Sequence, residues 1–89
     1  MQDQSFGIYG ERYVSLRGDI KDGCLHLESY VYGEEYDSEK HYTFSKEETD
    51  RLFEIVSLDE FIKLCREGYV SGMEAFFNEH GLEPSTFTF

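Results

Sequence analysis

The chain has few basic residues, and this scarcity dominates its composition. Its 89 residues include eight Lys and Arg against nineteen Asp and Glu, a formal net charge of −11 at pH 7. The eight bases are scattered, each with an acid nearby, so no basic stripe of the kind that binds DNA or RNA is present. A strongly acidic surface repels nucleic acid and anionic membranes and attracts basic proteins. The composition therefore argues against direct nucleic-acid binding.

The sequence also lacks signs of secretion or membrane insertion. No apolar run approaches the roughly 20 residues that cross a bilayer, and the first twenty residues contain no apolar segment typical of a secretion signal. The two cysteines, Cys24 and Cys65, do not form a C-x-x-C pair. We therefore expect reduced thiols, no membrane partner and a cytoplasmic location.

Motifs of catalysis and phosphate binding are missing as well. The patterns G-x-S-x-G, G-x-x-x-x-G-K-[ST] and G-x-G-x-x-G do not occur. The three histidines, His26, His41 and His80, lack the H-x-x-x-H or H-x-H spacing of common metal sites. His80 precedes Gly81, where a cation would relieve a helix dipole. We expect no enzyme, no catalytic residue, no cofactor and no metal.

The residues that are present indicate a folded chain. Aromatic residues make up 17% of it, with eight Phe, seven Tyr and no Trp. Disordered acidic chains are poor in aromatic and periodic apolar residues, whereas this chain has both. Eighty-nine residues suffice for one modest core. Residues 1–89 are expected to form a single acidic domain.

Three short helices are predicted between residues 45 and 80. A Ser-x-x-Glu pattern, in which a serine caps a helix and the glutamate bonds back to it, begins at Ser45, Ser57 and Ser71. Apolar residues follow each serine at helical spacing. Gly68 and Gly81 lie where C-cap glycines are expected. The first helix meets the second at Val56–Ser57 without a spacer, which predicts a sharp corner.

Residues 12–20 and 24–32 are predicted to form a β-hairpin around Asp22-Gly23, a strong hairpin signal. This turn places apolar pairs on one face and polar or aromatic pairs on the other. The apolar face pairs Val14 with Val31, Leu16 with Ser29, and Ile20 with Leu25. The outer face pairs Tyr13 with Tyr32, Ser15 with Tyr30, Arg17 with Glu28, and Asp19 with His26.

Further strands are expected at residues 38–44 and 85–89, the latter returning to a sheet edge. Residues 5–9 either extend the first strand or form a separate one. The predicted fold is α+β, with two layers. One layer is an antiparallel sheet of three to five strands, made from the N-terminal hairpin, the third strand and the C-terminal strand. The other contains the three short helices, all on one face.

Residues 28–39 are the candidate binding segment. They contain five acids and three tyrosines but no base. Carboxylates steer and pair with Lys and Arg, while tyrosines supply rigid anchors in protein interfaces. The candidate partner-binding residues are Glu28, Tyr30, Tyr32, Glu34, Glu35, Tyr36, Asp37 and Glu39.

The expected function is therefore that of a small acidic, non-enzymatic domain that binds a basic protein. In size and charge the chain is similar to bacterial immunity and inhibitor proteins, which cover basic nucleases or toxins, although it shares no motif with them. A nucleic-acid mimic would use the same physics against a DNA-binding protein. Two alternatives remain. One is a small-molecule or metal-responsive domain built around the histidines and tyrosines of the outer sheet face, where His26 and His41 with Asp19 and Glu28 could resemble a metal site. The other is a homo-oligomer joined through exposed tyrosines.

Overall fold

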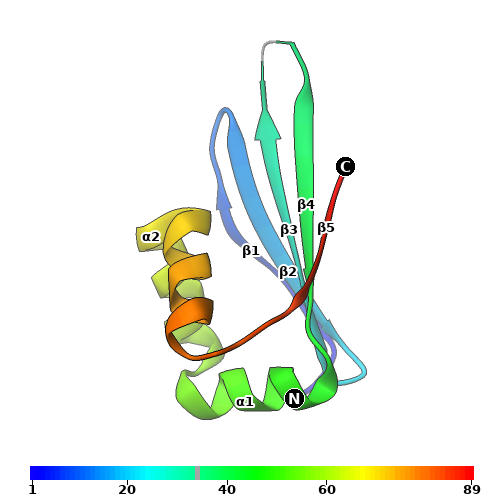
Figure 1. Cartoon of the computed structure of the whole chain (residues 1–89), viewed down its shortest axis with the longest axis vertical. Coiled ribbons are helices and arrows are strands. Elements are labelled where there is room, and N and C mark those ends of the chain that lie inside the picture. Colours follow the sequence, from blue (N-terminus) through cyan, green and yellow to red (C-terminus); the bar gives the residue numbers. More distant parts are fainter. Residues whose placement is uncertain (34) are drawn as a thin grey trace.

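The structure, a computed structural model that describes residues 1–33 and 35–89, is an open sheet with helices on one side (Figure 1). The elements in chain order are β1 (Gln4–Gly10), β2 (Val14–Lys21), β3 (Cys24–Tyr32), β4 (Asp37–Thr43), α1 (Lys46–Ile55), α2 (Leu58–Glu79) and β5 (Ser85–Thr88). The α+β class is confirmed.

Within the part of the chain that the structure describes, the sheet contains five strands in the order β1-β2-β3-β4-β5, and every neighbouring pair is antiparallel. Residues 5–9 belong to a separate strand, β1, whose register shifts between Gly7 and Tyr9. The C-terminal strand β5 lies at a sheet edge, as expected, and pairs there with β4. The sheet thus has the largest strand number that the sequence predicted.

The hairpin register is confirmed. Asp22 and Gly23 both have positive φ, 53° and 79°, as the two central residues of a type I′ turn require. Each predicted pair from Val14–Val31 to Ile20–Leu25 is observed. Tyr13 lies just before β2, and its carbonyl accepts a 2.8 Å hydrogen bond from the Tyr32 amide.

The core lies between the helices and the inner face of the sheet. Alternate strand positions face inward, which explains why a period of two places the apolar residues together. The buried hydrophobic residues are Ile8, Leu16, Ile20, Leu25, Leu27, Tyr42, Phe44, Leu52, Phe61, Cys65, Met73, Phe77 and Leu82. Cys65 is therefore a core residue.

Two of the three predicted N-caps are present. The Ser45 hydroxyl accepts from the Glu48 amide, and Ser57 and Glu60 form a complete capping box. The third prediction is wrong, since Ser71 lies inside α2 and donates to the Gly68 carbonyl at 3.4 Å.

The described residues form two helices instead of the predicted three, because the second and third are joined in α2. Its backbone is nevertheless non-helical at Tyr69, with φ 57° and ψ −161°. The rings of Phe61 and Phe77 stack with centroids 6.1 Å apart, whereas sixteen residues of straight helix would span about 24 Å. The two halves of α2 therefore fold back on each other, and the positive φ is at Tyr69 instead of Gly68.

The helices do not cover the whole sheet. β3 and β4 extend past the end of α2 (Figure 1). Val31, predicted to be a core residue, lies on the inner face but is 47% exposed. The strand ends next to residues 33–37 therefore project from the domain.

Candidate functional site

The candidate site lies on the outer face of the sheet, opposite the helices. The register between β3 and β4 brings Glu28 opposite His41, Tyr30 opposite Glu39, and Tyr32 opposite Asp37. Since side chains alternate along a strand, all of these residues share one face with the outer residues of β2. The face thus combines carboxylates, imidazoles and tyrosines.

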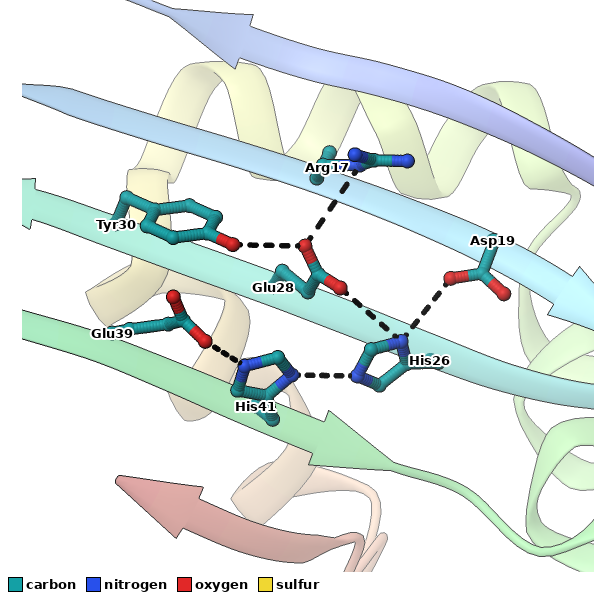
Figure 2. Close-up of polar contacts among 7 residues, drawn as sticks. All are labelled: Arg17, Asp19, His26, Glu28, Tyr30, Glu39 and His41. Carbon is teal, nitrogen blue, oxygen red and sulfur yellow. Dashed lines mark hydrogen bonds and ion pairs between the residues drawn. The ribbon is translucent and has the colours of Figure 1, made fainter. Parts of the chain in front are cut away.

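Four side chains on this face form a continuous hydrogen-bonded chain (Figure 2). Asp19 Oδ1 lies 3.1 Å from His26 Nδ1, and His26 Nε2 lies 2.8 Å from His41 Nδ1. His41 Nε2 in turn contacts the carboxylate of Glu39. That hydrogen bond lowers the pKa of Glu39. The two imidazoles thus lie between two carboxylates.

Glu28 lies beside this chain and is held by its own contacts (Figure 2). Its Oε2 accepts from the Tyr30 hydroxyl at 3.2 Å and lies 4.0 Å from Arg17 Nε. Its Oε1 lies 3.8 Å from His26 Nδ1. Desolvation, with the charges of Glu28 and Glu39, raises the pKa of Tyr30 to about 12. Tyr30 is therefore a neutral hydrogen-bond donor at physiological pH.

Aromatic rings extend the face in both directions. The rings of Tyr30 and Tyr32 stack with centroids 6.3 Å apart. Phe89 packs edge-on against His41 at 5.2 Å and against Phe87 at 4.7 Å. Tyr36, in the connection between β3 and β4, is 77% exposed and lines a shallow hollow with Val31 and Ser38, at the edge of this face. The surface therefore offers large apolar groups as well as charge.

The structure divides the predicted binding residues into two groups. Glu28, Tyr30 and Glu39 are half-buried and belong to the hydrogen-bonded cluster with the histidines. The residues of the projecting end are exposed, and we name this group the β3–β4 tip: Tyr32, Glu35, Tyr36 and Asp37. Glu34, also predicted to bind a partner, lies outside the described residues.

The hairpin turn predicts the pairing of Asp19 with His26, but it does not predict the contact of His26 with His41 or that of His41 with Glu39. Those contacts depend on the β3–β4 register, in which residue numbers of opposed positions sum to 69. The alternation of outer residues along residues 24–32 and 38–44 indicated the shared face. Knowledge of the register between β3 and β4 would have identified the cluster.

A second concave region lies on the inner face, between the sheet and the break in α2. This cleft has a volume of about 370 Å³ and includes Val31, Tyr42, Tyr69 and Glu74 in its lining. The buried Tyr42 hydroxyl has no hydrogen-bond partner among the described residues. Lys40 also lines the cleft, and its ammonium lies 3.1 Å from the Glu74 carboxylate. The cleft therefore contains one polar atom without a partner, the Tyr42 hydroxyl, and one ion pair in which Lys40 and Glu74 neutralise each other.

The two cysteines are free in the structure. Burial raises the pKa of the Cys65 thiol to about 12. This thiol is therefore protonated at neutral pH, as suits a core side chain.

Comparisons with known proteins assign no role to these residues. The chain matches no known protein family, no curated protein and no solved structure. Within the described residues, neither helix is long and apolar enough to cross a membrane. The site is therefore interpreted from its own chemistry.

Proposed function

We propose that this protein is a small acidic binding domain that recognises a basic protein through its β3–β4 tip and the adjoining outer sheet face. The tip extends past α2, so a partner can approach it without meeting the helical layer (Figure 1). Tyr32 and Tyr36, 44% and 77% exposed, present apolar surface there. Such tyrosines are common anchors of protein interfaces.

The observation that carries the proposal is the orientation of Lys40. This base is the nearest in sequence after the acidic segment, yet it lies on the inner face and pairs with Glu74 at 3.1 Å. In the described part of the chain, no ion pair neutralises Glu35 or Asp37. The tip therefore keeps uncompensated carboxylates beside exposed tyrosines.

The chemistry of this surface favours a partner with clustered Lys and Arg. Uncompensated carboxylates accelerate encounter with a positive patch, and the aromatic rings then supply contact area. A second copy of the chain is a poorer match, because the two tips would bring like charges together. The charge of the tip and its exposed rings thus favour a basic partner that is a different protein.

Neutralising the tip tests the proposal. The first step is capture of basic proteins from native lysate at about 0.1 M and about 1 M salt, since screening lengths at these concentrations are about 10 and 3 Å. Glu35→Gln with Asp37→Asn is then expected to slow association with the captured protein and to flatten its salt dependence. Unfolding free energy should change by less than about 0.5 kcal/mol, because both residues are exposed. Stopped-flow association and urea denaturation measure the two quantities.

The matched control is Glu54→Gln with Glu67→Gln. These substitutions remove the same two charges from exposed positions on α1 and α2. Association should slow less than in the tip variant, because the charges are distant from the proposed interface. Equal effects of the two variants would indicate a response to net charge and would contradict a localised binding surface.

A further inference from the structure

The centre of the outer face contains two imidazole nitrogens that point at each other. His26 Nε2 on β3 and His41 Nδ1 on β4 are 2.8 Å apart (Figure 2). Both side chains are partly buried, with 29% and 18% of their surface exposed. The pair is therefore held in place by the sheet while remaining accessible to a small ion.

The outer hydrogen bonds of the two rings determine which atoms carry hydrogen on the side where the rings meet. Asp19 and Glu39, as carboxylates, accept from His26 Nδ1 and His41 Nε2 respectively, so each ring donates outward. A neutral imidazole carries one N–H, which each ring has then used. The two inner nitrogens consequently face each other with lone pairs. Either an additional proton or a metal ion satisfies both.

Glu28 supplies a third donor group beside the histidine pair. One ligand atom from each of His26, Glu28 and His41 lies within 4.8 Å of those from the other two. The Glu28 Oε2 atom is held by Tyr30 at 3.2 Å, with Arg17 at 4.0 Å. Its Oε1 atom has no hydrogen bond within the described residues and lies 3.8 Å from His26 Nδ1, so the carboxylate has to turn toward the inner nitrogens to bind the same ion. This oxygen is free to coordinate.

The geometry points to a metal site, formed by His26, His41 and Glu28, that binds a divalent transition-metal ion of the zinc class. Metal-bound histidines usually donate their other N–H to a carboxylate, which fixes the tautomer and the ring orientation. Asp19 and Glu39 provide this support for both rings, and Tyr30 provides it for Glu28. Each of the three ligands is thus held in orientation by a neighbouring side chain. A chance cluster of acidic residues would not have such supporting contacts.

Ligand type selects the metal. Imidazole nitrogen suits Zn²⁺, Ni²⁺ and Cu²⁺, while Mg²⁺ and Ca²⁺ prefer oxygen ligands alone. A tetrahedral zinc with bonds of about 2.0–2.1 Å holds two nitrogens about 3.3 Å apart. The two nitrogens therefore need to separate by about 0.5 Å, and both rings need to turn until their lone pairs point at the ion. Three protein ligands leave one tetrahedral position for water or a partner's side chain. The expected site is therefore an open one.

Titration of the tag-free 89-residue protein with Zn²⁺ alone tests this inference by isothermal titration calorimetry. One equivalent should bind, and Mg²⁺ at the same concentration should not. His26→Gln and His41→Gln should each weaken zinc binding by more than about 100-fold, and Asp19→Asn, which removes only a supporting carboxylate, by about 10–100-fold. Co²⁺ provides a second readout through the visible absorption of a four-coordinate site.

His80→Gln is the matched control, because His80 lies at the C-cap of α2 and not on the sheet. Zinc affinity should be unchanged in this variant. If a ligand variant does not fold by circular dichroism, Glu28→Gln tests the same site through a third ligand. The inference is overturned if Zn²⁺ does not bind in one equivalent, or if a folded His41→Gln variant binds it unchanged. Either result would mean that the two histidines form a hydrogen-bonded pair and no metal site. Because the titration contains no protein partner, its outcome is independent of the proposed binding function.

Discussion

Replacing Phe77 with alanine is expected to lower the free energy of unfolding by about 3–5 kcal/mol, the usual cost of removing a buried phenylalanine. Phe77 is 3% exposed, and its ring contacts the rings of Phe61, Phe44 and Tyr42. It therefore joins the second half of α2 to the first half and to the sheet. Small domains have total stabilities of about 5–15 kcal/mol, so the variant should retain little stability. Urea denaturation followed by circular dichroism measures the difference.

Phe87→Ala is the control for this substitution, because it removes the same side chain from a position that is 60% exposed on β5. Its effect should be within about 0.5 kcal/mol, apart from the lost contact with Phe89. A cost below about 1 kcal/mol for Phe77→Ala would mean that the two halves of α2 do not pack on each other.

Truncating the exposed tyrosines of the β3–β4 tip is expected to have the largest effect on partner binding. The more damaging of the two substitutions, Tyr32→Ala or Tyr36→Ala, should weaken the free energy of partner binding by on the order of 2 kcal/mol. This is roughly a 30-fold loss of affinity, since each 1.4 kcal/mol corresponds to about tenfold. The loss should appear as faster dissociation, because interface anchors act after encounter. Surface-plasmon kinetics with the captured basic protein separates the two rate constants.

Tyr69→Ala serves as the matched control. Tyr69 is 43% exposed, close to the 44% of Tyr32, but it lies at the break in α2. It contacts Tyr9 and Glu11, so its removal affects the helical side of the domain. Dissociation should be unchanged in the folded variant. Faster dissociation for Tyr69→Ala than for both tip variants would move the interface to the helices.

The hairpin and the helical stripes were predictable because each rests on local chemistry. Asp22-Gly23 specifies a two-residue turn, and that turn determines every β2–β3 pair through alternation. The capping box at Ser57 is likewise contained in four consecutive residues. Such features need no knowledge of distant segments.

The remaining features depend on tertiary contacts. No local pattern predicts a positive φ at Tyr69, because tyrosine rarely adopts that conformation, so the cap was wrongly placed at Ser71. The register of β4 depends on a longer loop, and the histidine–carboxylate chain depends on that register. The exposure of Val31 reflects how far the strands extend past α2, which alternation alone does not reveal.

Residue-resolved NMR is the sharpest test of the proposal that a basic protein binds the β3–β4 tip and the outer face. The measurement is a titration of isotope-labelled protein with the captured partner, following the backbone amide shifts of every assigned residue. We expect smaller shifts along the outer residues of β3 and β4 and the largest ones at the tip residues Tyr32, Glu35, Tyr36 and Asp37. Shifts concentrated on α1 and α2, with the tip unchanged, would contradict it.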